Sequence, residues 1–140
     1  MYDQRILVVE DDPQIAYVLY WNLLVTGYAV TVAGDGLSAM RAFDTGEIAL
    51  VTVDLMLPLI SGFRLVKAFK RARPDIPVVV ISSLTFEEAE EVAQSGVNDF
   101  LTKPFDPRRF IDMVQYHLSS RLPAPVNPAP RPEPAILVRA

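Results

Sequence analysis

Five short apolar runs, most of them rich in β-branched residues, recur along the chain, and each is followed by a segment with the apolar spacing of a helix. Continuous apolar runs of this length are typical of strands that are covered on both faces, as in parallel sheets. Their alternation with helices predicts an α/β fold with three layers, a (βα)5 doubly wound parallel sheet with right-handed crossovers. The runs lie at residues 6–9, 29–33, 49–53, 78–81 and 100–101.

The predicted helices begin at residues that suit helix N-termini. Asp12 and Asp106 are each followed by a proline, which combines a capping side chain with a favoured first helical residue. Ser61 can cap the third helix, and residues 85–88 form a capping box. We therefore interpret Asp12 and Asp106 as caps and not as ligands of a site.

Apolar spacing also predicts which helix faces are buried. The first helix carries further apolar residues outside its expected stripe, and these could lie under the C-terminal tail, sit at the rim, or form a partner or self-association surface. The expected stripes are Ile15, Val18, Leu19 and Leu23 in the first helix and Leu37, Met40 and Phe43 in the second; the residues left outside are Tyr17, Tyr20, Trp21 and Leu24.

The composition excludes several kinds of site. Cysteine is absent, which excludes disulfides and thiolate ligands, and a single histidine, His117, excludes a metal site built from several histidines. His117 comes late in the last predicted helix, so we interpret it as a surface or helix-end residue. Asp99 is likewise interpreted as a surface or cap residue.

The charge pattern bears on partners and location. The net charge is −4 and Lys and Arg do not cluster, which argues against direct nucleic-acid binding by this segment. The apolar runs are too short to span a bilayer, and the N-terminus shows no signal peptide. We therefore expect a cytoplasmic protein without a membrane partner.

The C-terminal part of the chain has a different character. Six prolines lie between residues 123 and 134. This density disfavours helix and sheet and predicts an extended, disordered segment. We expect one globular domain over residues 1–121 and a Pro-rich tail or linker over residues 122–140.

Polar residues follow the predicted strands at their carboxyl ends, where doubly wound sheets bind ligands. In a sheet of order 2-1-3-4-5, strands 1 and 3 are neighbours, so Glu10, Asp11 and Asp54 should converge. Three carboxylates repel one another unless a cation neutralises them, and oxygen ligands without His or Cys suit Mg²⁺ or Mn²⁺. With the hydroxyl of Ser82 and the ammonium of Lys103, such a site suits phosphoryl transfer.

Four motifs in this order resemble the receiver domain of bacterial response regulators. They are residues 6–12, residues 54–58 with Gly62, Ser82, and residues 100–105, and the resemblance covers about residues 4 to 120. It implies a flavodoxin-like fold and a two-component phosphorelay. It also implies a signalling domain that phosphorylates itself and is not a conventional enzyme.

The resemblance implies a metal site. Asp11 would ligate Mg²⁺ directly and Glu10 through water. Asp54 and the backbone carbonyl of Met56 would complete the protein ligands.

The resemblance also implies roles in phosphorylation. Asp54 would be the phosphoacceptor, Ser82 would hydrogen-bond the phosphoryl group, and Lys103 would pair with it. Phe100 would be the aromatic switch that moves inward with Ser82, which would alter the face made by the fourth helix, fifth strand and fifth helix. The donor would be a sensor histidine kinase or a histidine phosphotransfer protein, and homodimerisation is left open.

Two other functions compete with this interpretation. A metal-dependent phosphohydrolase would need a second Asp two residues after Asp54, where this chain has Met56. A receiver that only docks a protein, without phosphorylation, would be expected to lack a phosphorylation residue. All of them are present here: Glu10, Asp11, Asp54, Ser82 and Lys103.

Overall fold

The computed structural model describes residues 4–119. The expected tail, residues 122–140, and the boundary that precedes it lie outside the described residues. Within residues 4–119, no helix is both long and apolar enough to cross a membrane.

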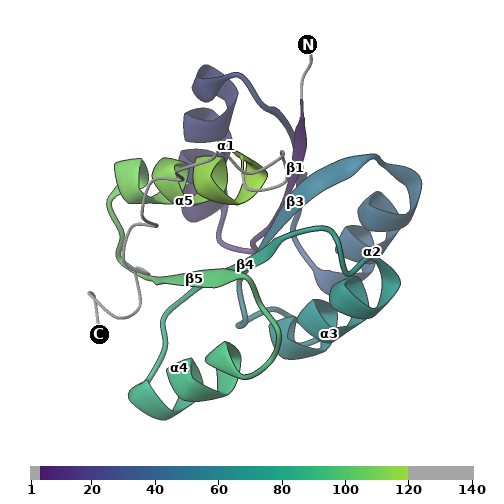
Figure 1. The fold of residues 1–140 in the computed structure, drawn as a ribbon, viewed down its shortest axis with the longest axis vertical. Helices are drawn as coiled ribbons and strands as arrows, with labels where there is room; N and C mark the ends of the chain where they lie inside the picture. The colour runs from purple at the N-terminus through teal and green to yellow at the C-terminus, as the bar shows by residue number, and fades with distance from the viewer. Residues whose placement is uncertain (1–3, 120–140) are drawn as a thin grey trace, which may run out of the picture.

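A five-stranded parallel sheet in the order β2-β1-β3-β4-β5 forms the middle layer of the molecule. Strands and helices alternate throughout, so the prediction of a doubly wound, flavodoxin-like (βα)5 fold is confirmed (Figure 1). The strands are β1 (Arg5–Val9), β2 (Ala29–Ala33), β3 (Ile48–Val53), β4 (Val78–Ser82) and β5 (Asp99–Thr102). The helices are α1 (Pro13–Thr26), α2 (Gly36–Thr45), α3 (Gly62–Ala72), α4 (Phe86–Ala93) and α5 (Pro107–Ser119).

Helices cover both faces of the sheet and make two cores. Helices α1 and α5 lie on one face, and α2, α3 and α4 lie on the other (Figure 1). The first core joins Leu19 and Leu23 of α1 to Phe110 of α5, over the sheet. The second contains Phe43 of α2 and Phe69 of α3, whose ring centroids are 4.5 Å apart. Continuous apolar strands are therefore needed, because each strand meets a core on either side.

The predicted N-caps are all observed. Asp12 accepts a hydrogen bond from the Gln14 N–H at 2.9 Å, and Asp106 accepts one from the Arg108 N–H at 2.9 Å. Ser61 caps α3, and Thr85 forms both hydrogen bonds of the capping box with Glu88. These side chains fix where α1, α3, α4 and α5 begin, after the loops that follow the strand ends and carry the polar residues.

The predicted helix stripes were partly wrong. In α2, Leu37 and Met40 are exposed, whereas Ala39 and Phe43 are buried together with Gly36. A Cβ at Gly36 would lie 2.8 Å from that of Ile60, so this small residue lets α2 approach the loop that precedes α3. Small residues at the contact therefore decided which face is buried.

The same correction holds for α1, where Ala16, Leu19 and Leu23 are buried and Val18 is exposed. This helix is apolar around its whole circumference, so spacing alone could not define its inward face. Tyr17, Trp21 and Leu24 lie exposed, as expected for residues outside the stripe, whereas Tyr20 is half-buried.

His117 and Asp99 are not surface residues, which corrects both interpretations. Each is less than 9% exposed, and His117 Nε2 lies 3.0 Å from Asp99 Oδ2. The other oxygen, Asp99 Oδ1, accepts a hydrogen bond from the Phe100 N–H at 2.9 Å. The pair connects α5 to the first residues of β5, because α5 crosses back over this strand.

Candidate functional site

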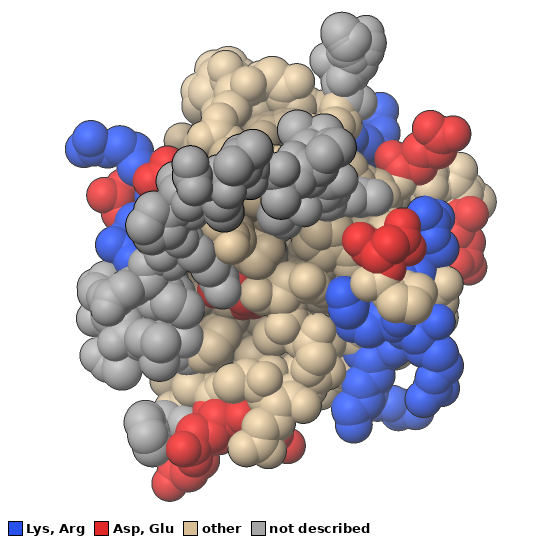
Figure 2. Space-filling model, in the orientation of Figure 1, with Lys and Arg blue, Asp and Glu red and all other residues tan. Residues whose placement is uncertain are grey.

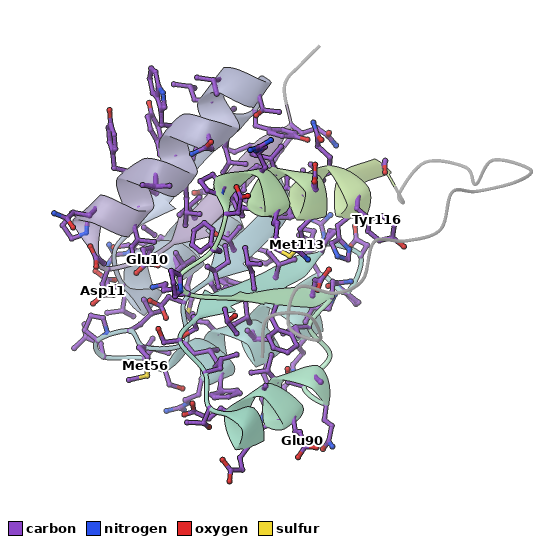
Figure 3. The ribbon with its side chains drawn as sticks, turned by 90° about the vertical axis from the view of Figure 1, so that its left-hand side faces the viewer. Glu10, Asp11, Met56, Glu90, Met113 and Tyr116 are labelled. Atoms are coloured by element: carbon purple, nitrogen blue, oxygen red, sulfur yellow. The ribbon has the colours of Figure 1, made fainter. Side chains whose placement is uncertain are left out.

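The three predicted carboxylates converge at the carboxyl edge of the sheet. Val9 of β1 pairs with Val53 of β3, and the Asp54 N–H donates to the Val9 carbonyl at 3.0 Å. This register places Glu10 and Asp54 next to each other. One carboxylate oxygen each from Glu10, Asp11 and Asp54 lies within 4.8 Å of the others, with Glu10 and Asp11 at the same edge in Figure 3.

Asp54 is buried, and both of its carboxylate oxygens accept hydrogen bonds. Oδ1 accepts from the Ser82 hydroxyl at 2.9 Å and from the Met56 N–H at 3.0 Å, and Oδ2 accepts from Lys103 Nζ at 2.8 Å. Ser82 ends β4 and Lys103 follows β5, so three neighbouring strands contribute to one carboxylate. These hydrogen bonds fix the orientation of the Asp54 carboxylate, with Oδ2 facing the ammonium of Lys103.

Lys103 connects two of the carboxylates. Its ammonium lies 3.0 Å from Glu10 Oε1 and 2.8 Å from Asp54 Oδ2. The Lys103 N–H donates to the Ser82 carbonyl at 3.1 Å, and the bond to Pro104 is cis. Lys103, the first residue after β5, therefore extends its side chain to the carboxylates of Glu10 and Asp54.

The titration behaviour of the cluster follows from burial and from these contacts. Burial raises the pKa of Glu10 from 4.5 to about 7; the hydrogen bond with Asp54 also raises it, and Lys103 opposes the shift. Burial alone would raise the pKa of Asp54, but the hydrogen bonds from Lys103, the Met56 N–H and Ser82 hold it below its ordinary value. Burial lowers the pKa of Lys103, but its contacts with Asp54 and Glu10 outweigh this and hold it above its ordinary value. Asp54 is therefore an anion and Lys103 a cation at neutral pH.

The donor set fits a hard divalent cation. Glu10 Oε1 is buried 3.0 Å from the ammonium of Lys103, yet it accepts no hydrogen bond of good geometry. Three carboxylates gather beside the ammonium of Lys103, which contacts two of them, Glu10 and Asp54. Oxygen ligands without nitrogen or sulfur favour Mg²⁺ or Mn²⁺. Asp11 is exposed and could reach such an ion from the solvent side.

The structure places the remaining predicted residues close to this cluster or in the core behind it. The side chain of Met56 is 70% exposed, and the residue lies at the site edge in Figure 3 while its N–H contacts Asp54. Phe100 is buried in the core between the sheet and helices α2 to α4. Its ring therefore occupies an inward position in this structure.

Gly62 contributes to the site in a way that the sequence analysis did not assign. A Cβ at this position would collide with the Asp54 carbonyl oxygen and with Leu55 Cα. The Gly62 N–H also donates to the Leu55 carbonyl at 3.1 Å. A glycine directly after the Ser61 cap was the available signal, because close packing of a helix on a backbone needs a residue without a side chain.

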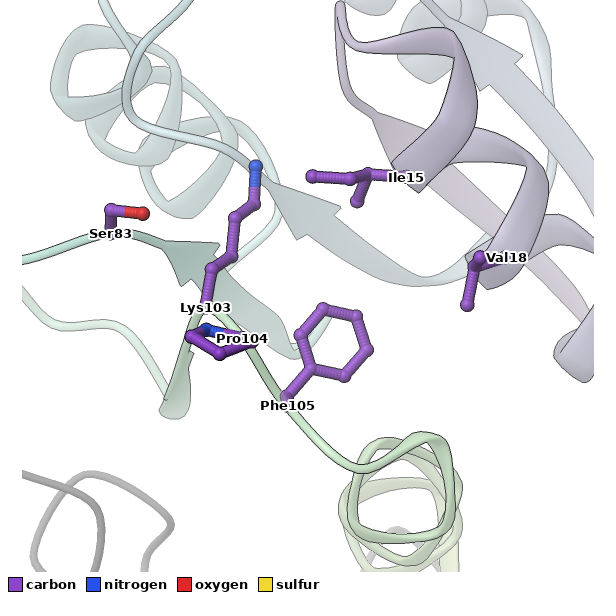
Figure 4. Close-up of a pocket in the computed structure, with 6 residues that line it drawn as sticks. All are labelled: Ile15, Val18, Ser83, Lys103, Pro104 and Phe105. Carbon is purple, nitrogen blue, oxygen red and sulfur yellow. The ribbon is translucent and has the colours of Figure 1, made fainter.

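A hollow of about 390 Å³ opens beside Lys103. Ile15 and Val18 of α1 face Phe105 across it, and Ser83 and Pro104 complete its lining (Figure 4). The cluster is therefore reached along a mostly apolar surface between α1 and the segment that follows β5.

Comparison with known proteins agrees with this geometry. A family model described as the response regulator receiver domain matches residues 6–115. The alkaline phosphatase synthesis transcriptional regulatory protein PhoP of Bacillus subtilis (strain 168) is 33% identical over 108 residues, which cover 76% of this chain and 45% of PhoP. The DNA-binding response regulator MtrA of Mycolicibacterium smegmatis (strain ATCC 700084 / mc(2)155) is 36% identical over 117 residues, 82% of this chain and 50% of MtrA. The chain thus spans about half the length of these two curated relatives.

A solved structure agrees in fold as well. The receiver domain of the Francisella response regulator 1452 superposes with a TM-score of 0.80 and 30% sequence identity, covering 86% of this chain and 100% of that one. The family match extends over most of the chain and includes every strand that carries a residue of the cluster. This chain belongs to the response regulator receiver domain family of two-component systems.

Proposed function

We propose that Asp54 accepts a phosphoryl group from a phosphohistidine, carried by a sensor histidine kinase or a histidine phosphotransfer protein. The observation that carries the proposal is the set of contacts around Asp54. Its carboxylate is buried, ionised, and hydrogen-bonded by Ser82 and Lys103 at 2.9 and 2.8 Å. A fixed carboxylate anion beside an ammonium and a hydroxyl is suited to attack phosphorus.

The proposed transfer is a direct displacement. An oxygen of Asp54 forms a bond to phosphorus while the bond between phosphorus and the donor imidazole nitrogen breaks. The electron pair of that bond stays on the imidazole, and the product on this chain is an acyl phosphate. Lys103 and Ser82 already contact the carboxylate, so they are placed to pair with the new phosphoryl oxygens.

Glu10, Asp11 and Asp54 would hold Mg²⁺, with the Met56 carbonyl as a further ligand. The ion would neutralise the charge that develops on the phosphoryl oxygens. The proximity of the three carboxylates, with the ammonium of Lys103 in contact with only Glu10 and Asp54, supports this assignment.

We further propose that phosphorylation changes the face formed by α4, β5 and α5. When the Ser82 hydroxyl turns toward a phosphoryl group, its hydrogen bond to the Asp54 oxygen breaks. The packing around the buried ring of Phe100, on the neighbouring strand, would change with it. Two arrangements of these residues would then differ in population between the unmodified and phosphorylated forms. DNA binding, which the name of MtrA states for that protein, is not proposed for this segment.

Intact-mass measurement after incubation with acetyl phosphate tests the proposal. We expect the mass of one phosphoryl group to be added in the presence of Mg²⁺, and none after chelation of divalent cations. Asp54→Asn should remove the adduct. Asp44→Asn, a control at an exposed carboxylate in α2, should retain it. An adduct of equal yield in Asp54→Asn, or no adduct on the unaltered chain, would refute the proposal, and the second result would favour a receiver that only docks a protein.

A further inference from the structure

Helix α1 presents an apolar outer face to solvent. Tyr17, Trp21 and Val25 follow one another at helical spacing and are 64%, 50% and 63% exposed. Leu24 and Val18 beside them are also exposed. The 14 residues of this helix include no charged side chain.

The other helices of residues 4–119 all carry charge. Acidic side chains gather at the outer edge of α4 and basic side chains over α3 in Figure 2, whereas the part of the surface over α1 that is visible at the top of this view shows neither. An apolar helix face without charge is typical of a surface that another segment covers.

We propose that residues 122–130 of the same chain pack on this face of α1. These nine residues are Leu-Pro-Ala-Pro-Val-Asn-Pro-Ala-Pro and contain no charge. Proline-rich segments bind aromatic surfaces in an extended conformation that loses little entropy on binding. Tyr17 and Trp21 supply such a surface, and neither side of the contact has a charge to desolvate.

The geometry of the chain makes the contact accessible. Helices α1 and α5 pack on the same face of the sheet and share one core. Both run antiparallel to the strands, so α5 ends, at Ser119, on the same side of the molecule as the C-terminal end of α1. Nine residues at about 3.1 Å each span about 28 Å, and the 14 residues of α1 span about 21 Å.

A segment of the same chain fits this face better than a second copy does. With roughly 150–250 Å² for an aromatic side chain, the exposed parts of the five residues amount to on the order of 500 Å². A stable dimer buries about 800 Å² on each partner. A tethered segment needs less, because the linker holds it near its site at a millimolar effective concentration.

The chain contains a single tryptophan, Trp21, so its fluorescence reports on this face alone. Acrylamide quenching would be measured on the full chain and on a full-length variant with P123S, P125S, P128S and P130S. We expect the quenching constant to rise about twofold in the variant, because the tethered cover is lost. The effect should not depend on protein concentration. A full-length control, P132S with P134S, alters prolines outside the proposed segment and should leave quenching unchanged.

Equal quenching of the full chain and the fourfold variant would overturn the proposal. Shielding of Trp21 that increases with protein concentration and persists in the variant would also overturn it, in favour of a second copy. An equal rise in the control would show that residues 122–130 are not the segment involved.

Discussion

Lys103 stabilises a group of carboxylates that would otherwise repel one another. It contacts Asp54 and Glu10, which end two different strands, at 2.8 and 3.0 Å. The two carboxylates respond differently. The pKa of Asp54 is held below its ordinary value by three donors, whereas burial raises the pKa of Glu10 to about 7. These contacts therefore favour the ionised form of Asp54, whereas burial favours the protonated form of Glu10.

Mg²⁺ affinity should therefore depend on pH through Glu10. A metal ligand must lose its proton, so affinity should rise by up to about tenfold per pH unit below the pKa and level off above it. With the pKa of Glu10 raised to about 7, the affinity should rise with pH up to about pH 7 and change little above it. Without metal, the same shift contributes stability that is fully present below 4.5 and is lost as the pH rises through about 7.

Calorimetric titration with Mg²⁺ between pH 5 and pH 8 would measure this dependence. Glu10→Gln, which cannot ionise, should remove most of it while the fold is retained. An unchanged pH dependence in Glu10→Gln would show that another group controls binding.

The buried contact between His117 and Asp99 should contribute measurably to stability. His117→Ala removes a buried ring and one partner of a 3.0 Å contact. We expect the free energy of unfolding to fall by about 2–4 kcal/mol in urea denaturation. Gln115→Ala, at an exposed position of the same helix, should change it by less than about 0.5 kcal/mol. Similar small losses in both variants would mean that the contact is energetically unimportant.

Among the elements, α3 packs directly on the loop that follows β3 and carries Asp54. Its first residue, Gly62, packs directly on the backbone of Asp54 and Leu55, and the Ser61 cap fixes where the helix begins. The Gly62 N–H also closes a hydrogen bond to Leu55. The start of α3 and the backbone around Asp54 are thus packed against each other as one unit.

Gly62→Ala should disturb this unit. The added methyl group meets backbone atoms that cannot move aside, so we expect a loss of about 1–3 kcal/mol in unfolding free energy and slower phosphorylation by acetyl phosphate. Gly34→Ala provides the control, because a Cβ there meets no atom within 4 Å. Equal phosphorylation rates in Gly62→Ala and in the unaltered chain would contradict this role.

Sequence patterns predicted the strands but not the buried faces of two helices. The strands were predictable because each one is mostly apolar without a polar face, a pattern typical of a covered parallel sheet. The inward faces of α1 and α2 were not, because α1 is apolar all round and α2 contacts its neighbours through Gly36 and Ala39. The pairing of His117 with Asp99 depends on how α5 crosses β5, which no local pattern contains.

For the whole molecule, the site follows from topology. Residues that are far apart in the sequence meet because parallel strands end at one edge of the sheet. Strand order and strand ends together were enough to predict that Glu10, Asp11 and Asp54 converge. The raised pKa of Glu10 and the packing of Gly62 could not be predicted, because both depend on distances set by the complete fold.

The proposed role of Asp54 predicts which residue carries the phosphoryl group. Borohydride reduces an acyl phosphate of aspartate to homoserine, so reduction after incubation with acetyl phosphate and Mg²⁺ marks the acceptor for peptide mapping by mass spectrometry. We predict homoserine at position 54 and unmodified residues at Glu10 and Asp11. Homoserine at position 11, or a phosphorylated chain without homoserine at position 54, would contradict the assignment of Asp54 as the phosphoacceptor.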